Sequence, residues 1–198
     1  MRRRWPETRT IHLVLAVLDP ATGLLPAGRH VCAKAEVESA FVTGGAFSSS
    51  TTRATIWGDW QNALNVLQSA ALVRAAWIGG SFTTAKMDPE DIDVTFIIDG
   101  ADMRGRTPQD QQIIALFAGG GQVKASLKLR VDAYILPWEC VPAPQPGMGP
   151  VQDGYYWARG YWDDWWQRAR VTAKGAPATP ADAIPRRGYV EVPVSDYA

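Results

Sequence analysis

Apolar residues recur along much of the chain at spacings of three and four, which predicts helices. A short helix is expected over residues 33–42, with Val37 and Phe41 on its buried side. The longest helix is expected from about residue 51 to residue 71. Its apolar side consists of Ile56, Trp60, Ala63, Leu64 and Leu67.

A third helix is expected to begin at Thr107. Pro108 then occupies the first helical position and Asp110 the third, which is typical of a capped helix start. The run of glycines from residue 119 to residue 121 ends this helix. Its buried side consists of Ile113, Ile114 and Phe117.

Short apolar runs rich in β-branched residues predict strands. The run at 92–98 is apolar almost throughout, so this strand is expected in the middle of a sheet. Pro137 is expected to end the last of these runs and to begin an irregular segment that reaches Pro150. The predicted strands cover residues 11–18, 75–78, 92–98 and 127–136.

The C-terminal part of the chain is rich in aromatic residues, with seven Tyr or Trp between residues 155 and 166. Residues 165–171 and 188–194 are predicted to form a pair of strands, joined by a Pro- and Ala-rich loop over residues 175–185. The aromatic side chains have two interpretations. They cover one side of the sheet, which we favour, or they form an acceptor surface in which Trp166, Arg168 and Arg170 share a face.

Together these elements predict an α/β (α+β) fold with a mixed, mostly antiparallel sheet flanked by helices. We expect a single domain over residues 1–198. Its core covers about residues 11–140, and residues 151–198 add the aromatic segment and the strand pair.

Composition narrows the class of protein. The chain has 46% hydrophobic and 20% charged residues, which is typical of a globular protein. Its net charge of +0 gives no general attraction to nucleic acid or to a membrane surface. Two cysteines are too few for a disulfide framework, and no apolar run is long enough to cross a bilayer, so we expect a cytoplasmic protein.

Acidic residues with chemical potential lie on two of the predicted strands. Asp91 and Asp93 are two residues apart, so their side chains leave a strand on the same face. Two carboxylates this close repel each other unless a cation lies between them. Asp132 is the only acid in the next predicted strand, where it is expected to bind the same metal and to activate a hydroxyl.

The residues before this acidic pair are suited to phosphate. Gly79 and Gly80 let backbone amides approach a triphosphate closely, and Ser81 adds a hydroxyl donor. Lys86 is expected to balance phosphate charge. Each feature alone is common in proteins, but their order along the chain is much more specific.

This ordered set resembles the nucleotidyltransferase superfamily typified by DNA polymerase beta, in its minimal form. The resemblance covers Gly80, Ser81, Asp91, Asp93 and Asp132. It implies that a nucleoside monophosphate moves from an NTP such as ATP to a hydroxyl, under two Mg²⁺ ions, with release of pyrophosphate.

A closer resemblance, over more of the chain, is to a small uncharacterised bacterial and phage family within that superfamily. It rests on the motifs DPATGLLPAGRH, AEVESAF, GGSFTTAKMDPEDIDV, WQRAR and RRGYVEV. The chain departs from the family pattern at Ala27, where a second Pro is usual, and in the loop over residues 175–185, which looks inserted.

Three functions remain open at this point. The first is nucleotidyl transfer to RNA, for example tRNA, or to a protein. The second is a non-catalytic protein that binds a nucleotide or a partner through the same fold. The third is the toxin of a toxin–antitoxin or phage-defence pair, with an antitoxin as its partner.

Overall fold

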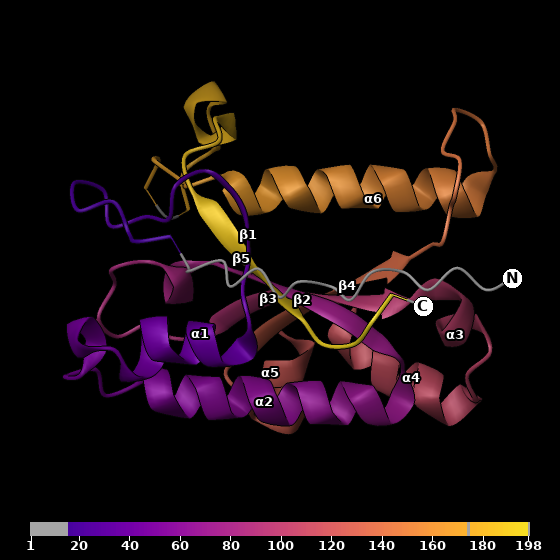
Figure 1. Ribbon diagram of the computed structural model, residues 1–198, viewed down its shortest axis with the longest axis horizontal. Coiled ribbons are helices and arrows are strands. Elements are labelled where there is room, and N and C mark those ends of the chain that lie inside the picture. The colour runs from indigo at the N-terminus through magenta and orange to yellow at the C-terminus, as the bar shows by residue number, and fades with distance from the viewer. Residues whose placement is uncertain (1–15, 174, 198) are drawn as a thin grey trace, which may run out of the picture.

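The computed structural model describes residues 16–173 and 175–197 and contains one five-stranded sheet between two helical layers (Figure 1). The strands lie in the order β1-β5-β2-β3-β4. No helix in these ranges is long and apolar enough to cross a membrane. The strands are β1 (Gly28–Val31), β2 (Val73–Gly79), β3 (Ile92–Asp99), β4 (Val131–Trp138) and β5 (Gly188–Pro193). The helices are α1 (Lys34–Glu38), α2 (Arg53–Ala70), α3 (Gly100–Arg104), α4 (Pro108–Phe117), α5 (Gln122–Leu127) and α6 (Pro150–Gln167).

The sheet is mixed, which confirms the predicted fold class. At its centre β2 pairs antiparallel with both β3 and β5. At its two sides β1 pairs parallel with β5, and β4 pairs parallel with β3. Antiparallel pairing is therefore limited to the centre of the sheet, and the expectation that the sheet is mostly antiparallel is wrong, because two of its four strand pairings are parallel.

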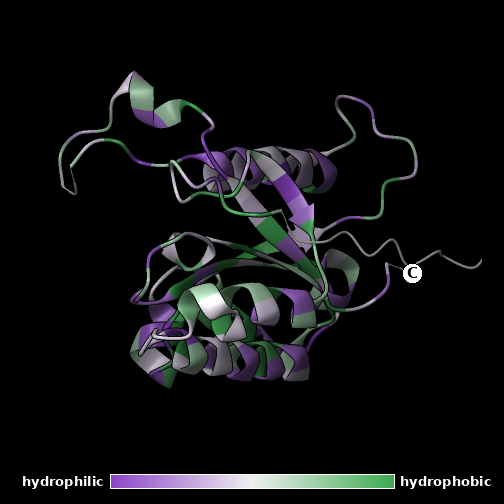
Figure 2. Cartoon of the chain, turned by 60° about the vertical axis from the view of Figure 1, so that its left-hand side comes forward, coloured by the Kyte–Doolittle hydropathy of each residue, from purple (hydrophilic) through white to green (hydrophobic). Residues whose placement is uncertain are grey.

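The larger part of the core lies between the sheet and the layer that contains α2 and α4. Hydrophobic residues are concentrated in the strands and on the helix surfaces next to them (Figure 2). Thr107 caps α4 as expected, and its hydroxyl accepts a hydrogen bond from Asp110 N. The predicted inward residues of α2 are all buried: Ile56, Trp60, Ala63, Leu64 and Leu67.

The other face of the sheet is covered by α6 (Figure 1). Tyr155 and Trp166 of this helix are buried against Trp77 of β2 and Tyr189 of β5. The indole Nε1 of Trp166 donates a hydrogen bond to Thr95 Oγ1 over 3.0 Å. This helix therefore encloses a second, smaller core on the α6 side of the sheet.

The predicted strand over residues 165–171 is wrong. Trp165 and Trp166 lie in the last turn of α6, and the segment after the helix retains only an isolated bridge between Arg168 and Pro185. The aromatic residues repeat with helical spacing as well as in alternation, and burial against the sheet selects the helix. The other half of the expected pair is a strand, β5, but it inserts between β1 and β2.

Other element boundaries also differ. The predicted strand over residues 11–18 lies partly outside the described residues, and residues 16–18 have no regular structure. β1 forms within a stretch expected to be a loop, and α5 was not predicted. β4 continues through Pro137 to Trp138, because it is an edge strand and proline is tolerated there.

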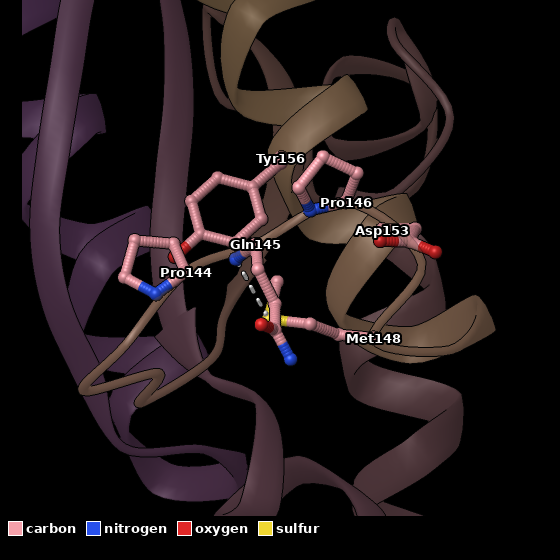
Figure 3. A pocket seen from close by; sticks show the side chains of 6 residues that line it. All are labelled: Pro144, Gln145, Pro146, Met148, Asp153 and Tyr156. Carbon is pink, nitrogen blue, oxygen red and sulfur yellow. Dashed lines mark hydrogen bonds between the residues drawn. The ribbon is translucent and has the colours of Figure 1, made fainter.

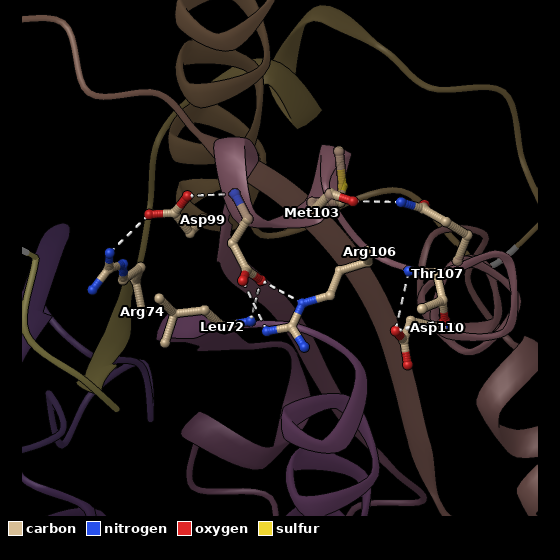
Figure 4. Close-up of polar contacts among 9 residues, drawn as sticks. Leu72, Arg74, Asp99, Met103, Arg106, Thr107 and Asp110 are labelled. Carbon is tan, nitrogen blue, oxygen red and sulfur yellow. Dashed lines mark hydrogen bonds and ion pairs between the residues drawn. The ribbon is translucent and has the colours of Figure 1, made fainter.

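Acidic residues at the C-terminal end of β3 serve the fold (Figure 4). Asp99 forms an ion pair with Arg74, with 2.8 Å between Oδ2 and Nη2. Asp102 accepts a hydrogen bond from Leu72 N and pairs with Arg106. These contacts fix α3 to β2 and leave the opposite end of β3 for other acids.

Candidate functional site

One edge of the sheet is formed by the ends of four strands: β2 ends there, and β3, β4 and β5 begin there. Asp93 of β3 is paired in register with Gly79 of β2 on one side and with Asp132 of β4 on the other. Asp91 lies two residues before Asp93, at the entrance to β3. The structure therefore brings the predicted acids to the same edge, beside the glycine turn.

The turn passes directly over one of these acids. Gly80 has φ of 65°, and a Cβ at this position would lie 1.6 Å from Asp93 Oδ2. Only glycine fits here, because it accepts the positive φ and has no side chain. Ser81 then opens a single 3₁₀ turn over Ser81–Thr83.

The three carboxylates have different partners. Asp91 Oδ2 lies 3.1 Å from Lys124 Nζ of α5. Asp132 Oδ1 accepts a hydrogen bond of 2.6 Å from Gly121 N, just before α5. Within the described residues, Asp93 accepts no hydrogen bond and forms no ion pair, although its side chain is partly buried.

The electrostatics of the edge follow from this crowding. The pKa of Asp93 is raised to about 6, first by burial and then by the negative charges of Asp91 and Asp132. The positive charges of Arg187 and Lys124 act in the opposite direction on this pKa. The edge thus concentrates negative charge that a cation stabilises.

The donor set fits magnesium in its chemistry, since carboxylate oxygens are the ligands that this ion prefers. The free carboxylate of Asp93 is the clearest single ligand. In residues 16–173 and 175–197, no three His, Cys, Asp or Glu side chains are gathered as a ready-made metal site. Asp91 and Asp132 would therefore exchange their contacts with Lys124 and Gly121 for contacts with an ion.

A cavity of about 430 Å³ opens beside this edge, between the sheet, the end of α6 and the segment that leads into β5. Gly80 and Asp93 form its inner wall, and Trp166 also lines it. The cavity is within the size range of small-molecule sites. Its basic residues are Arg168, Arg170 and Arg187.

Some of the residues around this edge were predictable from the sequence, and others were not. Lys86 is exposed and forms no ion pair in the described structure, and its backbone carbonyl accepts a hydrogen bond from Arg53. Lys124 lies beside the acids instead, on a helix that the pattern did not predict. Arg187 belongs to the quoted RRGYVEV motif, but its proximity to Asp93 depends on where β5 inserts in the sheet.

A second depression lies at the other end of α6 (Figure 3). It is lined by the proline-rich segment around Gln145 and by Tyr156. Its carboxylate, Asp153, is directed to the backbone N–H of Gly149 over 3.3 Å. No group of acids or bases meets there, so the edge around Asp93 remains the candidate site.

The model of a family of unknown function, DUF6932, matches residues 18–193 of the chain. No curated protein and no solved structure matches it.

Proposed function

The chain belongs to this family of unknown function, DUF6932, and we propose that it is a nucleotidyltransferase of the DNA polymerase beta-like superfamily. It would move a nucleoside monophosphate from an NTP to a hydroxyl group and release pyrophosphate. The observation that supports this most is the register that places Asp93 between Asp132 and the turn at Gly79 and Gly80. That is the order in which the chemistry needs metal ligands and a phosphate-binding turn.

The acids have distinct roles in this proposal. Asp91, Asp93 and Asp132 would hold two Mg²⁺ ions, which when bound offset the charge of the phosphates. The hydroxyl oxygen forms a bond to the α-phosphorus, and the bond from that phosphorus to the leaving pyrophosphate breaks. Asp132, at the start of β4, accepts the proton of the hydroxyl.

The turn and the basic residues would hold the triphosphate. Gly80 lines the cavity and carries no side chain, and Ser81 offers a hydroxyl at the start of its 3₁₀ turn, so both suit the β- and γ-phosphates. Lys86 keeps its proposed role as a balancing charge. Lys124, 3.1 Å from Asp91, would be released from this carboxylate when an ion binds.

A non-catalytic nucleotide-binding protein is the second candidate function. The contacts of Asp91 with Lys124 and of Asp132 with Gly121 favour it, because they already satisfy two of the three acids without a metal. With either function, we propose that the protein acts in the cytoplasm, since Cys32 and Cys140 are both free thiols.

Titration with NTP and Mg²⁺ tests the proposal. Wild type is expected to bind each NTP more tightly with Mg²⁺ than without it. The double variant Asp91→Ala/Asp93→Ala is expected to lose this dependence on the ion. Equally weak binding by both proteins would count against a metal–nucleotide site.

The matched control replaces one acid of α3, which follows the other end of β3. Asp102→Asn removes a carboxylate that pairs with Arg106 and caps Leu72 N, away from the site. Its binding of NTP and Mg²⁺ is expected to equal that of wild type in the folded fraction. Loss of binding in this control as well would assign the effect to unfolding.

A further inference from the structure

A row of exposed aromatic side chains runs along α6. Most of this row lies outside the core and outside the candidate site. Trp157, Tyr161 and Trp165 follow one another at intervals of four residues, and their side chains are 71%, 42% and 47% exposed. Their rings are nearly parallel. The angle between neighbouring planes is 12° for Trp157 and Tyr161 and 16° for Tyr161 and Trp165, with centroids 5.5 and 6.0 Å apart.

This aromatic row leads to the acids. Trp165, its last member, lines the same cavity as Asp93 and Gly80. Eight residues of helix separate Trp157 from Trp165, which corresponds to about 12 Å. At about 3.4 Å per nucleotide of one strand, the row has room for about three nucleotides.

Arginines gather where the row ends. Arg168 and Arg170 follow α6 directly, and the backbone N–H groups of Arg186 and Arg187 both donate to Gln167 O. Among the described residues, only Arg168 of these four is in an ion pair, with Asp164. The chain as a whole has no net charge, so this arginine cluster is a local concentration of positive charge.

The acids of the same region are engaged within the protein. Asp163 accepts a hydrogen bond from Tyr189, beneath the helix. Asp182 accepts hydrogen bonds from the backbone N–H groups of Val171 and Thr179, which fixes the loop behind the cavity. Both carboxylates keep their negative charge, but neither forms an ion pair with an arginine of the cluster, so Arg170, Arg186 and Arg187 have no ion-pair partner among the described residues.

We propose that the aromatic row and the arginine cluster bind the single-stranded end of a polynucleotide, the acceptor in the reaction, with its terminal hydroxyl directed to Asp93. Flat faces that stack on bases, together with cations that neutralise phosphates, are the means by which proteins hold single strands. A protein acceptor explains the aromatic side chains, but it does not by itself explain three arginines that form no ion pair within the described residues. The orientation of the polynucleotide, with its end at Asp93, rests on the proposed function. Its binding to the aromatic row and the arginine cluster does not.

Binding is measured by fluorescence anisotropy of a short labelled oligo(U), without NTP or Mg²⁺. Trp157→Ala and Trp165→Ala are each expected to weaken binding by about 5- to 100-fold, since a stacked base contributes strongly to affinity. Arg170→Gln is expected to lower the salt dependence, the slope of log K against log[salt], by about 0.7. Oligo(dT) tests whether the site prefers RNA, and a duplex of the same length is expected to bind weakly.

Two control variants match these substitutions. Tyr156→Ala removes an exposed aromatic of α6 outside the row, and Lys34→Gln removes a cation that lies over Trp60, on the other face of the sheet. Both are expected to bind oligo(U) as wild type does. Equal affinity of all variants, or capture of a protein by the row with no affinity for oligo(U), would overturn the proposal.

The failure of this proposal is distinguishable from failure of the nucleotidyl-transfer function. Asp93→Asn removes a proposed metal ligand but leaves the aromatic row and the arginines in place. It is expected to bind oligo(U) at least as well as wild type and to transfer no nucleotide. Transfer to a protein by wild type, with no binding of oligo(U), would keep the enzyme and reject the acceptor.

Discussion

The indole of Trp166 occupies the space that a side chain at residue 79 would need. A Cβ added to Gly79 would lie 2.5 Å from Cε3 of this indole. The last turn of α6 therefore packs against the end of β2, next to Asp93. The position of this helix and the geometry of the candidate site are thus coupled through one contact.

Gly79→Ala is therefore expected to destabilise the protein by about 1–3 kcal/mol, the usual cost of overpacking a buried contact. Trp166 is buried, so it has little room to move away. Urea unfolding followed by tryptophan fluorescence measures the change. Gly154→Ala is the control: its added Cβ meets nothing within 4 Å, and alanine in a helix is expected to stabilise by up to ~1 kcal/mol. Equal stability of both variants would contradict the tight contact at Gly79.

Arg53 holds the segment that carries the glycine turn and Lys86. Arg53 is buried, with 1% of its surface exposed. Its guanidinium donates to five backbone carbonyls, which uses all of its N–H groups. The acceptors are the carbonyl oxygens of Phe41, Phe82, Thr84, Lys86 and Met87.

Arg53→Met is expected to lower the free energy of unfolding by about 3 kcal/mol or more, because it leaves buried carbonyls without donors. Arg53→Lys is expected to recover only part of the loss, since an ammonium group has three donors. Thermal or urea unfolding measures both. Arg186→Met, on an exposed residue, is the matched control. A loss below 1 kcal/mol for Arg53→Met would contradict the structural role.

Asp182 makes the loop behind the cavity sensitive to acid. Hydrogen bonds from Thr179 N and then from Thr172 N and Val171 N lower the pKa of its carboxyl below the ordinary value. Because the folded pKa lies below the unfolded one, the stabilisation is present above about pH 4 and is lost as the pH falls further. Hydrogen exchange at Val171 and Thr172, corrected for intrinsic rates, is expected to speed up in acid.

Asp182→Asn reproduces this loosening at neutral pH. Trypsin is expected to cleave the variant faster than wild type after Arg170 and Arg186, which flank the loop. Asp153→Asn, which weakens a hydrogen bond at the start of α6, is expected to leave cleavage at these two sites unchanged. Identical digestion of the Asp182 variant and wild type would show that the hydrogen bonds do not hold the loop.

The two thiols are expected to differ in reactivity. Cys32 is buried, and burial, followed by the charge of Glu36, raises its pKa to about 11. Cys140 is exposed. At pH 8 iodoacetamide is expected to label one site in the native protein and two in urea, and Cys140→Ser to remove the fast site. Rapid native labelling of Cys32, seen by mass spectrometry, would contradict its burial.

The predictable part of the fold depended on strong local patterns. The apolar side of α2 is long enough to define the helix, and the Thr107-Pro108 cap defines the start of α4. The edge shared by Asp93 and Asp132 was also expected, because side chains alternate along strands and β3 and β4 are successive strands. Local signals and tertiary structure agree at these positions.

The rest depended on contacts between distant parts of the chain. β5 joins the sheet between β1 and β2, and no local signal in its sequence specifies those neighbours. Aromatic residues on several sides of α6 concealed its helical period, so Trp165 and Trp166 were assigned to a strand. The cavity lined by Arg187 and Asp93 was not foreseen either, because it depends on the positions of α6 and β5.

The most direct test of the central claim is transfer of label from α-³²P-labelled NTPs, each in turn, to RNA or protein in a cell extract, with Mg²⁺ present. Wild type is expected to label an acceptor and release pyrophosphate. Asp93→Asn and Asp132→Asn are expected to lose this activity by at least about 100-fold while remaining folded. Labelling that is equal in wild type and in both variants, or absent from wild type with every NTP, would contradict nucleotidyl transfer at this edge of the sheet.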